Sequence, residues 1–276
     1  MMKLIADSSA NLTMLEGVTY QSVPMTIRAG ERDFVDDETL DTHELLDYLA
    51  AYNGKSGTAC PSLDGWLKAF EGADEIFVIT ITSSLSGTCA SAMAARDVYL
   101  QSHPEVKIHI FDTLSTGPEM QLLAEKLAEL HAKGLPFDVV CEKAQEYLAT
   151  THLFFSLKSL HNLAQNGRVS KIAAGAIGIL GIQILAKASE QGTIEPVEKC
   201  RGDKKARNAL VDEMYRFGYR GGKVRIHHAE NPETAGALAA ALRDRFPWTE
   251  IEIRPCTGLC SYYAERGGVI VGFETA

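Results

Sequence analysis

The sequence has no paired cysteines, no long apolar run and no surplus of positive charge. Its six cysteines form no Cys-x2-Cys pair, which argues against a structural zinc site and against a disulfide framework. Cys256 and Cys260 come nearest to a metal motif, but neither a second pair nor a nearby histidine supports it. We therefore expect no metal, no cofactor and free thiols. No stretch approaches 18 uninterrupted apolar residues, so no membrane span is expected.

The low content of positive charge limits the kinds of partner that the protein is expected to bind. The 276 residues include 27 Lys and Arg against 36 Asp and Glu, a net charge of -9. This balance argues against a general nucleic-acid surface or an anionic-membrane surface. The start MMKLIADSS enters a strand-like segment without a charged-then-apolar signal region, so we expect a cytoplasmic protein.

The length and the pattern of elements favour an α/β protein of two domains. A chain of 276 residues exceeds the usual span of one hydrophobic core. Strand, polar loop and helix recur through the first half, which predicts a mostly parallel sheet. The character of the sequence changes near Thr151, so we place the domain boundary there.

Residues 76–93, IFVITITSSLSGTCASAM, change character in their middle. Ile76 to Ile81 is an apolar, β-branched run that is typical of a buried strand. Residues 82–88 then supply five hydroxyls and a glycine where a helix should begin. Such a helix start can bind a carboxylate or a phosphate. The alternative is a Ser-rich turn that only caps its own helix.

Three further polar loops begin at Asp7, Thr58 and Asp112. Together with the loop at Thr82 they could converge on one sheet edge, where ligands usually bind in open α/β sheets. Between the first two loops, residues 20–27 predict a single strand interrupted by Pro24, and residues 28–37 predict a charged turn.

Two features of the second half have both a structural and a functional interpretation. Residues 172–185 are rich in Ala, Gly and Ile, which predicts a closely packed core helix or an element against which an apolar ligand lies. His227 and His228 are adjacent in a predicted strand, so their rings should point to opposite faces. We expect one buried structural histidine and one exposed histidine.

A set of motifs resembles the DegV family of bacterial fatty-acid-binding proteins. The motifs occur in the family's order over most of the chain: ADSSANL at 6–12, VPMTI at 23–27, TACPS at 58–62, TSSLSGT at 82–88, FDTLSTG at 111–117, LKSLHNLAQNGRVS at 157–170 and KCRGDKKA at 199–206.

The resemblance implies the fold and the ligand. It implies a mostly parallel α/β domain over residues 1–150 and a smaller mixed-sheet α/β domain over residues 151–276, with a long-chain fatty acid of about C16 to C18 buried between them. In that family the protein does no chemistry itself. It presents the acyl carboxylate to a separate ATP-dependent fatty acid kinase, and the acyl phosphate enters phospholipid synthesis. We expect a monomer.

The resemblance also implies site residues. Thr58 and Ser83 would hold the carboxylate, with Ser86, Gly87 and Thr88 shaping the turn. Four basic residues would engage the kinase or the developing acyl phosphate: Arg168, Arg201, Lys204 and Lys205. Tyr263 stands where the family often has a histidine, so a neutral phenol would replace an imidazole as a hydrogen-bond donor to the carboxylate.

Two other functions stay open at this point. A serine hydrolase would need a Gly-Xaa-Ser-Xaa-Gly elbow, whereas Ser86 lies between Ser84 and Thr88. A protein that binds a phosphate ester or a sugar phosphate is the other alternative, because a helix N-terminus does not distinguish a carboxylate from a phosphate.

Overall fold

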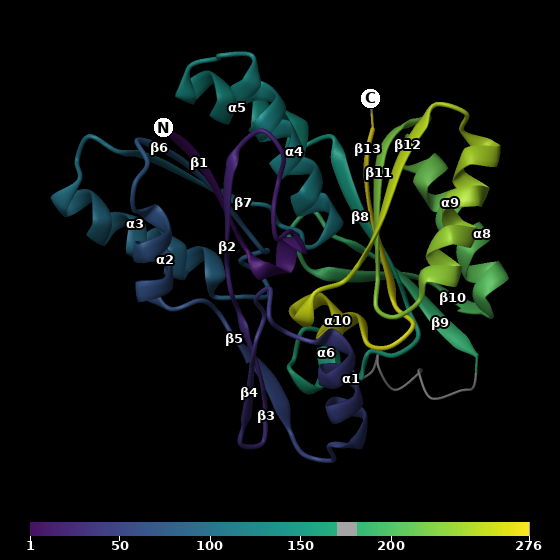
Figure 1. Cartoon of the computed structure of the whole chain (residues 1–276). Coiled ribbons are helices and arrows are strands. Elements are labelled where there is room, and N and C mark those ends of the chain that lie inside the picture. Colours follow the sequence, from purple (N-terminus) through teal and green to yellow (C-terminus); the bar gives the residue numbers. More distant parts are fainter. Residues whose placement is uncertain (170–180, 276) are drawn as a thin grey trace.

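A four-stranded parallel sheet forms the first half of the chain (Figure 1). The computed structural model describes residues 1–169 and 181–275. The strands lie in the order β2-β1-β6-β7 and comprise β1 (Met2–Asp7), β2 (Thr19–Val23), β6 (Glu75–Thr80) and β7 (Lys107–Asp112). Short η1 (Ser8–Ala10) follows β1.

Helices cover both faces of this sheet, as its apolar strands predict. In β6, Phe77 and Ile79 pack with the helices of one face, whereas Ile76 and Val78 pack with those of the other. The first face carries α4 (Pro118–Ala132) and α5 (Phe137–Leu148), and the second carries α2 (Leu63–Phe70) and α3 (Thr88–Ser102).

A small antiparallel sheet, in the order β4-β3-β5, extends from the first. It comprises β3 (Thr26–Ala29), β4 (Arg32–Val35) and β5 (Ser56–Ala59), with α1 (Thr42–Ala51) beside it. The single strand expected over residues 20–27 is therefore wrong, because the chain leaves the parallel sheet at Pro24 and enters a second sheet. The charged turn expected over residues 28–37 contains β4, and Thr58 lies on a strand.

The second half forms a six-stranded mixed sheet in the order β10-β9-β8-β13-β11-β12. Its strands are β8 (Thr151–Leu157), β9 (Ile182–Ala188), β10 (Ile194–Arg201), β11 (Gly222–His228), β12 (Thr249–Pro255) and β13 (Val269–Glu274). Only β11 and β12 are parallel neighbours. Two helices pack on the outer face, α8 (Asp203–Arg216) and α9 (Pro232–Arg245).

The parallel sheet and the mixed sheet confirm the expected fold class. α4 packs against β13 and β11 and so joins the two halves. Gly272 in β13 permits this contact, because an added Cβ would come within 2.7 Å of the backbone of Glu119. The strands of the first two sheets precede residue 113 and those of the mixed sheet follow residue 150, but the division into two domains at that residue stays a prediction.

Two short helices lie between the halves: α6 (His161–Gln165) and α10 (Gly258–Ala264). Figure 1 shows α10 beside α6 and α1, although α10 and α1 are far apart in the sequence. The sequence pattern did not indicate α10, because a seven-residue helix is too short to display a periodicity.

Two expectations for the second half need correction. The helix expected over residues 172–185 is wrong for its last four residues, because Ile182 begins β9. Residues 172–180 lie outside the described part of the chain. The exposed histidine is also wrong, since His227 and His228 are 0% and 9% exposed.

Candidate functional site

The loops that follow β1, β6 and β7 meet at one edge of the parallel sheet. Asp7 accepts hydrogen bonds from the amides of Ser9 (3.0 Å) and Ile81 (2.7 Å). The amide of Thr82 donates to the carbonyl of Ser115 at 2.9 Å. This convergence follows from the strand order, because the carboxyl ends of parallel strands share an edge. Burial raises the pKa of Asp7 to about 6.

A cavity lies between this edge and the inner face of the mixed sheet. It encloses an empty volume of about 760 Å³, including its opening to solvent. Its apolar lining comes from the mixed sheet, the loops after β6 and β7, and α10: Leu153, Phe155, Leu157, Ile270, Ile81, Leu85, Leu114 and Leu259. The cavity therefore joins residues that lie more than one hundred positions apart.

β8 forms an apolar wall of the cavity. Leu153, Phe155 and Leu157 alternate with Phe154, which points into the outer core with α8 and α9. Four residues along a strand cover about 13 Å, so these three side chains form a continuous apolar strip of that length. An alkyl chain has the shape to lie along such a strip.

Hydroxyl groups line part of the same cavity. Thr58 Oγ1 and Tyr263 Oη lie 2.9 Å apart, and both residues line the cavity. Ser86 also lines it, and its Oγ lies 2.8 Å from Oγ1 of the buried Thr88. Residues from β5, from the loop before α3 and from α10 thus bring these three hydroxyls to one cavity, which Thr82, Ser115, Thr116 and Thr193 also line.

The other hydroxyls of the Ser-rich loop make different contacts, although Thr82 also lines the cavity. Ser83 is exposed and does not line the cavity, and its amide donates to Asp112 at 3.0 Å. Thr82 Oγ1 donates to the carbonyl of Gly192 at 2.9 Å, and the Ser84 hydroxyl donates to the carbonyl of Gln191. These two side chains therefore hold the turn between β9 and β10 against the loop.

Helix capping accounts for one contact of the loop, since the Ser86 hydroxyl accepts the amide of Thr88, the first residue of α3, at 3.3 Å. Gly87 is the N-cap of α3, and no side-chain capping hydrogen bond is present there. Gly87 has a negative φ of -78°, so its backbone conformation does not require glycine.

The four predicted basic residues separate into two places. Arg168 lines the cavity, and its guanidinium donates to the carbonyl of Leu85 at 3.1 Å and to that of Asn166. Arg201, Lys204 and Lys205 are exposed around the start of α8 and line a different surface hollow. The ammonium of Lys205 lies 3.2 Å from Glu198.

Within residues 1–169 and 181–275, no group of three or more His, Cys, Asp or Glu side chains could hold a metal ion. The same ranges contain no helix that is long and apolar enough to cross a membrane. All six cysteines are free thiols. Among the described residues that line the cavity, Arg168 is the one with a charged side chain.

The fold and the cavity define an α/β protein in which the edge of a parallel sheet and the inner face of a mixed sheet enclose an apolar site. The family model described as uncharacterised protein, DegV family, matches residues 1–275. The chain therefore belongs to the DegV family, which confirms the resemblance found in the sequence motifs.

Individual relatives match along nearly the whole chain. A DegV domain-containing protein of Streptococcus pneumoniae is 43% identical over 99% of this chain and 98% of the relative. The crystal structure of a DegV family protein from Eubacterium eligens loaded with heptadecanoic acid has a TM-score of 0.99 and 47% identity, and all of both chains is covered. The S. pneumoniae Fatty Acid Kinase (Fak) B3 protein loaded with linoleic acid has a TM-score of 0.98 and 42% identity, covering 100% of this chain and 99% of that one.

Proposed function

We propose that this protein binds one long-chain fatty acid in the cavity, with the alkyl chain against β8 and the carboxylate at the hydroxyls. The observation that carries the proposal is an apolar cavity that also presents the hydroxyls of Thr58, Ser86 and Tyr263. The two solved relatives named above carry fatty acids in the same fold at more than 40% identity.

The alkyl chain supplies most of the binding free energy. Burying one methylene is worth about 0.8 kcal/mol, so about 14 methylenes represent on the order of 11 kcal/mol before entropy costs. Each hydrogen bond to a charged carboxylate adds roughly 1.5 to 3 kcal/mol. The tail therefore decides whether a lipid binds, and the hydroxyls decide which end faces them.

Ser86 is a better candidate than Ser83 for the serine that binds the carboxylate. Ser86 lines the cavity that also contains Thr58 and Tyr263, whereas Ser83 is exposed beside Asp112. In our proposal Thr88 orients the Ser86 hydroxyl, and Gly87 keeps the loop free of a side chain. Ser83 stays in the proposal as the loop serine against which Ser86 is tested.

We further propose that the protein is a carrier that presents the carboxylate to a separate ATP-dependent fatty acid kinase, for use in phospholipid synthesis. The likeness to Fak B3 supports this partner. Arg168 would face the carboxylate or the acyl phosphate, and the exposed Arg201, Lys204 and Lys205 would contact the kinase. The proposed ATP-dependent partner and the six free thiols support a cytoplasmic location. We also propose that the protein is a monomer and needs no cofactor.

The hydrolase and phosphate-ester alternatives receive less support. A hydrolase needs a general base beside its serine, and among the described residues no His, Asp or Glu lines the cavity. A sugar phosphate would leave its hydroxyls against Leu, Ile and Phe side chains, where they would lose hydrogen bonds to water.

Denaturing extraction followed by mass spectrometry tests the ligand class. We expect the purified protein to release close to one equivalent of long-chain fatty acid per chain. Empty protein that also fails to bind added heptadecanoic acid, or protein that releases a sugar phosphate, would contradict the proposal.

Two serine variants test the head-group assignment. Ser86→Ala should weaken the binding of heptadecanoic acid by about tenfold, because one hydrogen bond to a charged group is lost. Ser83→Ala, three residues away in the same loop, is the matched control and should bind as the unsubstituted protein does. The opposite pattern would assign the carboxylate to Ser83.

A further inference from the structure

Helix α10 carries Tyr263 but is held in place by side chains from distant parts of the chain. Its seven residues follow Thr257, which provides no side-chain capping hydrogen bond within the helix. The carboxylate of Asp36 accepts the amides of Gly258 (2.6 Å) and Leu259 (2.9 Å) instead. A helix this short is unstable by itself, so its position depends on such contacts.

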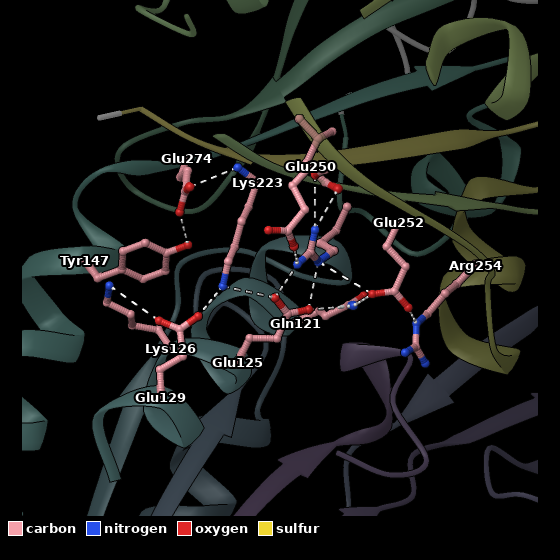
Figure 2. Close-up of polar contacts among 12 residues, drawn as sticks. Gln121, Glu125, Lys126, Glu129, Tyr147, Lys223, Glu250, Glu252, Arg254 and Glu274 are labelled. Atoms are coloured by element: carbon pink, nitrogen blue, oxygen red, sulfur yellow. Dashed lines mark hydrogen bonds and ion pairs between the residues drawn. The ribbon is translucent and has the colours of Figure 1, made fainter. Parts of the chain in front are cut away.

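Thr257 is also the first member of a series of hydrogen bonds whose middle members are buried. Its amide and its hydroxyl donate to Oδ1 of Asn11 at 3.0 and 2.9 Å. Asn11 Nδ2 lies 2.7 Å from Nδ1 of His227, and His227 Nε2 lies 2.7 Å from Oε1 of Gln121. Gln121 Nε2 then donates to Glu125 and Glu252, both at 2.9 Å, as Figure 2 shows.

Every donor in this series of hydrogen bonds faces an acceptor when His227 is neutral. Because Asn11 Oδ1 is taken by Thr257, its amide nitrogen must donate to Nδ1, and the proton of His227 lies on Nε2. That proton reaches Gln121 Oε1, which leaves the Gln121 nitrogen to donate to the glutamates. A protonated imidazole would set two donors against each other at Asn11.

The surroundings keep His227 neutral and exclude water from the middle of this series of hydrogen bonds. Asn11, Gln121 and His227 are 4%, 1% and 0% exposed. Burial, with smaller contributions from Arg254, His228 and Arg225, lowers the pKa of His227 to about 3. A buried polar group that loses its partner has no water to replace it, so each link depends on the next.

The far end of the chain is fixed by ion pairs between α4 and the mixed sheet. Arg225, on β11, donates from Nε and Nη2 to the two carboxylate oxygens of Glu125 at 2.7 and 2.6 Å. Arg254 pairs with Glu252 at the same place (Figure 2). This bidentate geometry fixes the position of the Glu125 carboxylate. It therefore also fixes the side-chain amide of Gln121, which donates a hydrogen bond to that carboxylate.

We propose that His227 and Gln121 are positioning residues of the fatty-acid site, which act through Asn11 and Thr257 on the start of α10. They fix the helix so that Tyr263 Oη stays 2.9 Å from Thr58 Oγ1 at the cavity. The inference rests on the proposed fatty-acid function. Neither residue lines the cavity.

A double-mutant cycle tests this assignment. Gln121→Met keeps the length of the side chain and removes its hydrogen bonds, and we expect it to weaken heptadecanoic acid binding by about tenfold. In a Tyr263→Phe background the same change should cost at most about threefold, because the hydroxyl through which it acts is already absent. Equal losses in both backgrounds would overturn the proposal.

The control is Gln183→Met. Gln183 is a buried glutamine in β9 that is 4% exposed, hydrogen-bonds to Ser156 and Asp203, and does not line the cavity. Its change should leave affinity within about twofold, with a comparable loss of folding stability. If it weakens binding as much as Gln121→Met does, a general loss of stability is the cause and the proposal is wrong.

A readout without ligand separates this inference from the proposed function. With 3-fluorotyrosine at position 263, Gln121→Met should move the 19F resonance of the ligand-free protein, whereas Gln183→Met should not. A moved resonance in a protein that binds no fatty acid would retain the positioning role and refute the function. An unmoved resonance refutes the positioning role. If Gln121→Met does not fold, Asn11→Gly serves instead, since glycine adopts the φ of 56° found at Asn11.

Discussion

The hydroxyl of Tyr263 lies 2.9 Å from that of Thr58 at the cavity. The family resemblance predicts that it stands in place of a histidine. A phenol donates one hydrogen bond and stays neutral near pH 7, whereas an imidazole can gain a proton in that range. The carboxylate would therefore meet a neutral donor at this position.

Replacement of this tyrosine by histidine should make fatty-acid affinity depend on pH. In Tyr263→His the imidazole gains a proton as the pH falls from 8 to 6, so binding of heptadecanoic acid should tighten by about fivefold to tenfold. The unsubstituted protein and Tyr263→Phe should show a smaller change over the same range. Calorimetric titrations at the two pH values measure this, and a flat profile for Tyr263→His would remove residue 263 from the head-group site.

Single residues also show where sequence reasoning stopped. The motif TSSLSGT indicates hydroxyls at the end of a strand, but it does not say which of them face a cavity. The tertiary structure turns Ser86 inward, exposes Ser83, and uses Thr82 and Ser84 to hold the β9–β10 turn. The direction of a loop side chain depends on its packing partners, which in this protein come from the other half of the chain.

At the scale of elements, the start of α4 brings a carboxylate into the junction of the two halves. Glu119 is 5% exposed and accepts a hydrogen bond from Thr151 at 2.6 Å and another from Ser115. Burial raises the pKa of Glu119 to about 7, and these hydrogen bonds lower it only in part. The fold therefore favours the protonated acid.

This raised pKa sets the sign of a pH effect on stability. A carboxyl group with a higher pKa in the folded state stabilises the fold at low pH, and that contribution is lost as the pH rises from about 4.5 to about 7. Glu119→Gln should remove this dependence. Relative to the variant, the unsubstituted protein should lose on the order of 3 kcal/mol of unfolding free energy between pH 4.5 and pH 8.

Glu233→Gln is the matched control for that experiment. Glu233 also follows an N1 proline at the start of a helix, α9, but it is exposed. Denaturant unfolding at several pH values should show no pH-dependent difference for this variant. If Glu119→Gln also shows no pH-dependent difference in unfolding free energy, ionisation of Glu119 does not destabilise the folded protein and the prediction is wrong.

At the scale of the whole molecule, the cavity exists because one edge of the parallel sheet faces the mixed sheet. Its walls come from the edge of the parallel sheet, the inner face of the mixed sheet and α10. Neither half encloses it alone. The length of the apolar strip, and not the head group, should therefore set the preference for chain length.

A homologous series of saturated fatty acids should show this directly. From about C10 upward, each methylene should tighten binding by about fourfold until the cavity is full, after which the gain should stop. Competition against a fluorescent fatty acid measures the series. Methyl esters of the same acids are the control: they should keep the slope per methylene and lose a constant factor for the charge. An affinity that does not change with length would contradict a tail bound along β8.

The sequence alone determined the class of the protein and the order of its main elements. The apolar strands and the recurring polar loops predict a parallel α/β sheet, because periodicity and turn chemistry are local properties. The family motifs added the fatty acid as the ligand that the resemblance implies. The family resemblance named Thr58 and Ser83 as carboxylate ligands, with Ser86, Gly87, Thr88 and Tyr263 beside them, and this assignment stays a prediction.

Only the tertiary structure decided how these pieces combine. It placed Tyr263 against Thr58 across 205 positions of sequence, formed α10 from residues with no helical pattern, and buried both histidines of β11. It also separated Arg168 from Arg201, Lys204 and Lys205. The physical reason is that burial, hydrogen-bond partners and side-chain direction depend on elements that are distant in sequence, and no local pattern contains that information.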